Sequence, residues 1–399
     1  MSLNEGREKC CPMRLLRTFF RPLLGPIFGV TILLTSIFGA YIITLILPIL
    51  LLGKHQTWRS TMDRAISFWM MIPVTFLEYI FGVAFTVTGD PIDSEKPALV
   101  IMNHRTRLDW MYFWSAIFKI NPWLICSSKI SLKEQLRKLP GAGFGMAANH
   151  FIFLQRHIDE DKRRLSEAID YYVAMRRNYQ ILLFPEGTDK SPWTTEKSRE
   201  YAKKNGLRDL KNVIYPRSAG IAYLITKMRQ CNYISCVYDV TVAYPINVVQ
   251  SEMDLVLKGQ CPEKVHFDIR RIDISQVPQS ERDIAEWLNR LWIMKDEKLT
   301  RYYSLPPAKR EFSSEGGKFI WEEADQPLHR IAKLFSFWFW MVVISTYCYH
   351  VTFLLFTQLV TLYSLCAILT MQFVYGGIDH MVYYRWKKAS SNKRISRTV

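Results

Sequence analysis

The feature that most constrains this chain is a long uncharged stretch near its N-terminus. Residues 22–53 contain no Asp, Glu, Lys or Arg. A helix needs about 20 apolar residues to cross the hydrocarbon core of a bilayer, so this stretch is long enough to span one. Glycines and prolines interrupt it, which also permits a bent or re-entrant path. We therefore expect a membrane to hold the N-terminal part of the chain.

Two further stretches are similarly apolar. Residues 334–377 carry no formal charge and are long enough for a tight hairpin of two spans. Residues 65–87 contain Glu78 near their middle, and a carboxylate at mid-bilayer depth costs on the order of 3 kcal/mol. We predict an interfacial or re-entrant segment there, and the alternative is a buried helix of a soluble domain.

The chain is also strongly basic, with a formal net charge of +16. Such a charge favours nucleic acid, or an anionic surface or substrate, as the partner. The apolar ends favour a phospholipid membrane, and no zinc-finger or RNA-recognition pattern is present, so no nucleic-acid partner is expected. Basic residues flank the apolar stretches, and such residues tend to stay cytosolic. Cys10 and Cys11, beside the first stretch, are candidates for palmitoylation.

The middle of the chain alternates between two patterns. Charged segments of helical period, such as 160–177, separate short apolar runs. These runs are residues 98–102, 151–154, 180–184, 233–243 and 265–269. The alternation predicts an α/β domain with a mostly parallel sheet covered by helices. In such sheets the chemistry lies where strands end and loops begin.

These patterns together predict how the chain is divided. The expected segments are a basic cytosolic N-terminus (1–21), membrane-embedded or re-entrant helices (22–90), the α/β domain (91–312), a connecting segment (313–333), a transmembrane hairpin (334–378) and a basic tail (379–399).

A histidine and a carboxylate follow the first of the predicted strands. His104 comes just after the run 98–102, and Asp109 lies five residues further on. Histidine acts as a general base near neutral pH, and an adjacent acid holds its tautomer and offsets the charge that it gains. Five residues exceed the ideal helical spacing of three or four, but one loop residue would bring the pair together. A helix-capping or core histidine is the alternative on spacing alone.

Four sequence blocks include this pair or follow it along the chain. They are, in order, NHRTRLD (103–109), FIFLQR (151–156), FPEGT (184–188) and YPR (215–217). In this order they resemble the membrane glycerolipid acyltransferase family, typified by the 1-acylglycerol-3-phosphate acyltransferases. Further stretches, among them KISLKEQLRKLPGAGFG, AKKNGL and DVTVAYP, look like the lysocardiolipin and lysophosphatidylinositol acyltransferase branch. Asp189 departs from the common FPEGTR form. This reversal of one charge argues against a simple lysophosphatidate acyltransferase.

The resemblance implies an acyl transfer from acyl-CoA, as co-substrate, to the free hydroxyl of a lysophospholipid. His104 would be the general base, and Asp109 would orient it and stabilise its imidazolium form. No cofactor is implied, and no histidine and acid spacing indicates a metal site. The resemblance favours the endoplasmic reticulum membrane. The N-terminus carries Glu5 and Glu8 and is poor in serine, so it does not resemble a mitochondrial transit peptide.

The remaining site predictions concern phosphate and acceptor binding. Arg156 would bind the phosphate of the acceptor, with an ion pair to Asp159 or Glu160 as the alternative. Arg217 is a candidate for phosphate or CoA contact.

The loop 186–188 is a further candidate. Glu186 would hold an acceptor hydroxyl or position the arginines, and Gly187 would allow a close backbone approach to a phosphate or oxyanion. Thr188 belongs to the same loop, for which an ordinary turn is the alternative.

A short basic, helix-like run completes the candidates. Its Lys129 and Lys133 are expected to contact CoA phosphates or anionic headgroups. A solvated charged face is the alternative for each lysine.

Three rival functions follow from the same residues. One is lysophosphatidate acylation, and a second is transacylation without CoA. The third is an inactive membrane scaffold, against which the intact set of His104, Asp109, Arg156 and Glu186 argues. The sequence predicts no particular oligomeric state.

Overall fold

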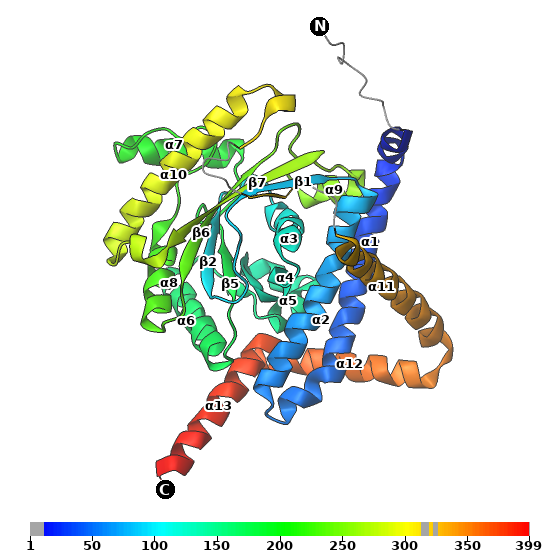
Figure 1. Ribbon diagram of the computed structural model, residues 1–399. Helices are drawn as coiled ribbons and strands as arrows, with labels where there is room; N and C mark the ends of the chain where they lie inside the picture. Colours follow the sequence, from blue (N-terminus) through cyan, green and yellow to red (C-terminus); the bar gives the residue numbers. More distant parts are fainter. Residues whose placement is uncertain (1–11, 313–318, 322–325, 399) are drawn as a thin grey trace.

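The computed structural model describes residues 12–312, 319–321 and 326–398 (Figure 1). In this part of the chain an eight-stranded sheet has helices on both faces, and long apolar helices lie along one side of it. Cys10 and Cys11 lie outside the described residues, as do parts of the predicted segments 1–21 and 313–333.

The strand order is β4-β3-β5-β2-β6-β7-β1-β8. The strands are β1 (Ala84–Gly89), β2 (Ala98–Met102), β3 (Ser128–Lys133), β4 (Ile152–Leu154), β5 (Gln180–Leu183), β6 (Cys236–Ala243), β7 (Lys264–Asp273) and β8 (Phe319–Trp321). The α-helices are α1 (Pro12–Leu51), α2 (His55–Thr75), α3 (Asp109–Ile120), α4 (Leu124–Ser127), α5 (Ala142–Ala148), α6 (Ile158–Ala174), α7 (Pro192–Lys204), α8 (Ser218–Gln230), α9 (Glu252–Lys258), α10 (Glu281–Ser304), α11 (Pro327–Phe353), α12 (Leu355–Tyr375) and α13 (Ile378–Thr398).

The predicted mostly parallel sheet is confirmed. Strand β2 pairs in parallel with β5 and β6, and β3 pairs in parallel with β4 and β5. Every residue of β2 is buried, as expected for a parallel strand that helices cover on both faces. The exceptions are the antiparallel pairs β6–β7 and β1–β8. An antiparallel pair needs no crossover helix, and the segment between β6 and β7 contains only the short α9.

Two strands lie where the sequence predicted something else. Strand β1 begins within residues 65–87, which were predicted as a membrane segment, so the sheet begins before the predicted boundary at residue 91. The apolar residues of β1 continue directly from the preceding helix, so composition shows no break between them. Strand β3 occupies the first part of the run that was predicted as helix-like. That run becomes 3-10 helical only from Glu134 to Lys138.

Three described helices are long and apolar enough to cross a membrane, over Phe19–Leu51, Pro327–Phe353 and Leu355–Tyr375. The last two, α11 and α12, fill the stretch predicted as a hairpin and project away from the sheet (Figure 1). Helix α2 is not one of the three. One face of α2 is buried, with Trp58, Met62 and Met70 in the core, which agrees with the alternative of a buried helix.

A glycine fixes the contact between α1 and the catalytic domain. Gly141, just before α5, has a φ of +66°, and a Cβ there would lie 2.4 Å from the backbone of Ser36 and Ile37. No other residue type accommodates both that backbone conformation and that approach. The apolar helix α1 is therefore packed directly against the domain that contains the sheet.

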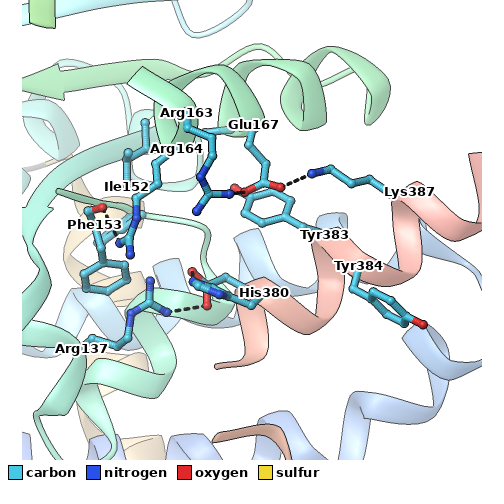
Figure 2. Close-up of a pocket in the computed structure, with 13 residues that line it drawn as sticks. Arg137, Ile152, Phe153, Arg163, Arg164, Glu167, His380, Tyr383, Tyr384 and Lys387 are labelled. Atoms are coloured by element: carbon cyan, nitrogen blue, oxygen red, sulfur yellow. Dashed lines mark hydrogen bonds and ion pairs between the residues drawn. The ribbon is translucent and has the colours of Figure 1, made fainter. Parts of the chain in front are cut away.

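The C-terminal helix α13 docks on α6 and closes a cavity of about 230 Å³ (Figure 2). The ion pairs Arg137–Asp379 and Lys387–Glu167, each 2.5 Å long, join the two sides. Arg163 also faces Glu167, at 3.9 Å. Because the charges here pair with one another, we regard this region as the place where α13 attaches to the domain that contains the sheet.

Candidate active site

Five strands bring the site together at one edge of the sheet. Strands β2, β3, β4, β5 and β6 are linked through parallel pairs, so their carboxyl ends lie along the same edge. His104 follows β2, Arg156 follows β4, and the loop 185–189 follows β5. Residues that are 30 to 80 positions apart in the chain therefore become neighbours.

His104 and Asp109 are in direct contact. His104 Nδ1 lies 3.0 Å from Asp109 Oδ2. That oxygen also accepts hydrogen bonds from the backbone amides of Arg105 at 2.6 Å and Thr106 at 2.9 Å. The loop thus folds around the carboxylate, which overcomes the five-residue spacing. Because Asp109 holds Nδ1, the imidazole is left with Nε2 for a substrate in the cavity that His104 lines.

Two aromatic side chains complete the surroundings of the pair. The Tyr244 hydroxyl donates a hydrogen bond to Asp109 Oδ1. Burial raises the pKa of Tyr244 well above its usual value, so the phenol remains a neutral donor. The Phe184 ring stacks on the His104 ring, with centroids 4.2 Å apart. Both contacts restrict the orientation of the His104–Asp109 pair.

Glu186 lies beneath this pair instead of facing a ligand. Its side chain is buried, and Oε1 accepts a hydrogen bond from Trp292 Nε1 on α10 at 3.2 Å. Burial raises the pKa of Glu186 to about 8, so the carboxyl is mainly protonated at neutral pH. The expectation that Glu186 holds an acceptor hydroxyl or positions the arginines does not agree with this placement, because its side chain points into the core.

Gly187 shapes the loop through its backbone. Its φ is +71°, and a Cβ there would lie 3.3 Å from Cδ of Arg217. The Gly187 amide donates to the Phe184 carbonyl at 2.9 Å, and its carbonyl accepts from Arg156 Nη2 at 2.7 Å. The sequence predicted that a phosphate or oxyanion would approach the backbone of Gly187. In the structure, the side chains of Arg156 and Arg217 approach it. The Thr188 hydroxyl lies 3.5 Å from Asp189 Oδ1.

Arg156, Arg217 and His104 line one cavity of about 580 Å³. Its polar lining includes His104, Arg107, Lys133, Arg156, Asp189 and Arg217. Its apolar lining includes Leu132, Leu136, Leu154, Leu165 and Ile221. Burial, and then the nearby Arg156 charge, lowers the pKa of Lys133. The cavity therefore offers cations for a phosphate and an apolar surface for a hydrocarbon chain.

Comparison with known proteins matches two family models to the chain. The model described as Acyltransferase matches residues 84–245, and the one described as Acyltransferase C-terminus matches residues 255–340.

The chain belongs to the acyltransferase family.

Full-length relatives refine this membership. Lysophosphatidylinositol acyltransferase 10 of Caenorhabditis elegans is 53% identical over 94% of this chain and 97% of its own length. Lysocardiolipin acyltransferase 1 of Danio rerio is 32% identical over 93% of this chain and 98% of its own. These relatives confirm the branch that the motifs indicated and the prediction that this acyltransferase is an enzyme.

Lys129 of this acyltransferase is not placed to bind a ligand, contrary to the prediction. Its side chain is fully buried, with Nζ 2.8 Å from Asp63 Oδ1 and 2.7 Å from Asn149 Oδ1. Asp63 also pairs with the buried Arg59 at 3.0 Å. Burial lowers the pKa of Lys129 to about 8. This lysine joins α2 to the sheet, and only Lys133 of the predicted pair lines the cavity.

Arg156 is placed as the phosphate prediction requires. It lines the cavity and contacts the loop 185–189, while Glu160, its alternative partner, pairs with Arg163 and Arg164. Arg217 lines the same cavity. The roles of these residues in binding stay predictions.

Sequence reasoning missed Tyr244, Phe184 and Gln250 as parts of the site. Gln250 Nε2 donates to the backbone carbonyls of Arg105 and Lys190 and to Asp189 Oδ2, so it joins the loop after β2 to the loop after β5. Tyr244 could have been found, because it directly follows β6 at the same edge as His104. Gln250 lies in an irregular segment between β6 and α9, and no local pattern identifies it.

Proposed function

We propose that this acyltransferase transfers a fatty acyl group from acyl-CoA to the free hydroxyl of a lysophospholipid. The observation that carries the proposal is that His104, in contact with the buried Asp109, lines a cavity with both cationic and apolar surfaces. A lysophospholipid has the matching parts: an anionic phosphate, a hydrocarbon chain and a hydroxyl nucleophile. No cofactor or metal is needed for this reaction.

In the proposed reaction His104 acts as the general base. Nε2 takes the hydroxyl proton as the oxygen attacks the thioester carbonyl, and Asp109 stabilises the resulting imidazolium. The tetrahedral intermediate collapses with cleavage of the carbon–sulfur bond, and the imidazolium returns the proton to the CoA thiolate. A thioester is already activated, so an acyl-enzyme intermediate is not required.

The proposed acceptor is lysophosphatidylinositol or lysocardiolipin. Support comes from the relatives with these activities, each of which aligns over more than nine-tenths of this chain. In the proposed binding mode, Arg156 and Arg217 hold the phosphate against the loop 185–189, because a guanidinium can contact a phosphate through two hydrogen bonds. Lys133 adds charge for the acceptor or for CoA.

The proposed location is the endoplasmic reticulum membrane, with the catalytic domain on the cytosolic side. The three apolar helices support attachment to a membrane, and the basic flanks support the orientation. An acyl-CoA would then arrive from the cytosol while the acceptor enters from the bilayer. Protease protection of the catalytic domain in sealed microsomes tests this arrangement, and a protected domain contradicts it.

The deciding experiment measures CoA release by membranes that contain the protein. The acceptors are lysophosphatidylinositol, lysocardiolipin, lysophosphatidylglycerol and lysophosphatidate, each with oleoyl-CoA, and His104→Ala is the control. We expect activity with the first two that disappears in the variant. Activity with lysophosphatidate alone would retain the reaction and overturn the acceptor. Acyl transfer between lipids without CoA would support a transacylase, and equal silence of both proteins would support a scaffold.

A further inference from the structure

The cavity contains a carboxylate among the cations that we propose to bind phosphate. Asp189 is the last residue of the loop 185–189, which Arg156 contacts, and its side chain lines the same cavity as Arg156 and Arg217. Its Oδ1 lies 3.7 Å from Arg107 Nε, and its Oδ2 accepts a hydrogen bond from Gln250 Nε2 at 3.1 Å. The next residue, Lys190, donates its backbone amide to the His104 carbonyl at 2.8 Å. Asp189 is therefore held close to the catalytic histidine.

Asp189 is well placed to act on a ligand in the cavity. Its side chain is 10% exposed, whereas Glu252, the other carboxylate that approaches Arg107, is 47% exposed. A charge that is shielded from solvent acts more strongly on its neighbours than one that water and salt screen. Arg107 is itself 56% exposed, and at 3.7 Å its pairing with Asp189 is loose, so it does not cancel this charge fully.

The net charge of the cavity lining also bears on which phosphate the cavity accepts. Four cations, Arg107, Lys133, Arg156 and Arg217, face three carboxylates, Asp161, Asp189 and Glu252. The excess of one positive charge matches a phosphodiester, which is a monoanion. A phosphate monoester has a second pKa near 6 and carries about −1.5 to −2 charges at neutral pH. It would therefore bring an uncompensated negative charge beside Asp189.

We infer that Asp189 is a specificity-determining residue that selects phosphodiester lysolipids with a hydroxylated headgroup over lysolipids with a terminal phosphate. Its carboxylate repels a phosphate monoester dianion and accepts a hydrogen bond from a headgroup hydroxyl, as a charged acceptor does strongly. The inference rests on the proposed function, because it assumes that the acceptor phosphate lies among these cations. The proposed function names residues that bind the acceptor, and the inference adds Asp189 as a residue that excludes the wrong acceptor.

The test compares the full-length wild type with Asp189→Asn in detergent–lipid micelles. The readout is kcat/KM for lysophosphatidylinositol and for lysophosphatidate, at a fixed saturating concentration of acyl-CoA. The variant keeps the size of the side chain and removes the charge. We expect it to shift the ratio of the two values at least about tenfold toward lysophosphatidate, with the KM for acyl-CoA unchanged. Glu252→Gln is the matched control, and its more exposed charge should shift the ratio only about twofold.

The outcomes separate this inference from the proposed function. If the wild type prefers lysophosphatidylinositol and Asp189→Asn leaves the ratio unchanged, Asp189 does not select and only the inference is overturned. An equal fold-decrease in kcat/KM for both acceptors also overturns only the inference, because it shows a general effect on the loop and not a change in selectivity. A wild type that prefers lysophosphatidate overturns the inference and the proposed acceptor, and retains the proposed acyl transfer. If no acceptor is turned over, the affinities of wild type and variant for the two radiolabelled lysolipids are measured at equilibrium. The ratio of these affinities then tests the inference independently of the proposed function.

Discussion

Lys129 and Lys133 lie on the same strand, β3, and in opposite surroundings. Side chains alternate along a strand, so residues four positions apart point toward the same face. Lys129, near the start of β3, is enclosed beside α2 and pairs with Asp63. Lys133, at the end of β3, is exposed and lines the cavity. Position along the strand, and not the face, separates a structural lysine from a candidate ligand-binding one.

The comparison extends to the groups around each lysine. The network of Arg59, Asp63, Lys129 and Asn149 is buried, and its members hydrogen-bond to one another. The cavity charges are partly exposed, and several contact backbone carbonyls or distant carboxylates. We therefore expect substitutions in the network to act on stability, and substitutions in the cavity to act on turnover.

The largest expected effect is on turnover, from His104→Ala. Loss of a general base typically lowers the rate by 10²- to 10⁴-fold, and we expect a decrease of about 10³-fold in kcat. The melting temperature should change by less than about 2 °C, because the His104 side chain faces the cavity. CoA release measures the change in kcat, and thermal unfolding of the same preparation measures the change in melting temperature. A large loss of stability would place His104 with the structural network and break the comparison.

The second prediction contrasts Lys129→Met with Lys133→Met. Removal of one partner from a buried charge network costs about 3 kcal/mol, so Lys129→Met should lower the melting temperature by about 5 °C or more. Lys133→Met should leave the melting temperature unchanged and raise the KM of an anionic substrate several-fold. Thermal unfolding in detergent, followed by tryptophan fluorescence, measures the first effect. The comparison fails if the two variants change the melting temperature and the KM by the same amounts.

The third prediction concerns pH and Glu186, which is buried below the cavity. Its carboxyl loses a proton near pH 4.5 in the unfolded chain and near pH 8 in the folded protein. The folded state therefore binds more protons between these values, and its stability falls as the pH rises through that window, by up to about 1.4 kcal/mol per pH unit.

Glu186→Gln should lack this slope, because the amide does not titrate. Unfolding of wild type and variant between pH 5 and pH 9 measures the difference, which should grow up to about pH 8 and then level off. Parallel curves would show that Glu186 is not protonated at neutral pH.

The smallest expected effect comes from Arg156→Lys. The variant keeps the charge and loses the two-pronged contact with a phosphate, so kcat/KM for the lysolipid should fall about fivefold. Arg163→Lys is the control, because Arg163 does not line the cavity that contains His104. Its kcat/KM should stay within about twofold of the wild-type value. Equal effects of the two substitutions would remove Arg156 from the binding site.

Much of the architecture could be predicted from local patterns. The fully apolar run that forms β2 is readable because a strand covered on both faces needs apolar side chains throughout. The rule that loops at the carboxyl ends of parallel strands meet was enough to place His104 near the loop 185–189. Strand β1 was missed because its residues are as apolar as the helix before it, so composition does not separate a sheet core from a membrane segment.

The order of the motifs and the apolar ends determined, by themselves, the family, the α/β fold and the candidate base with its acid. These properties are carried by residue type and short spacing, which do not depend on the rest of the chain. The tertiary structure alone decided that Lys129 and Glu186 point into the core, that Tyr244 reaches Asp109, and that Asp189 lies among cations. Burial and charge compensation depend on neighbours that are distant in sequence, and the same residue type is structural or functional according to those neighbours.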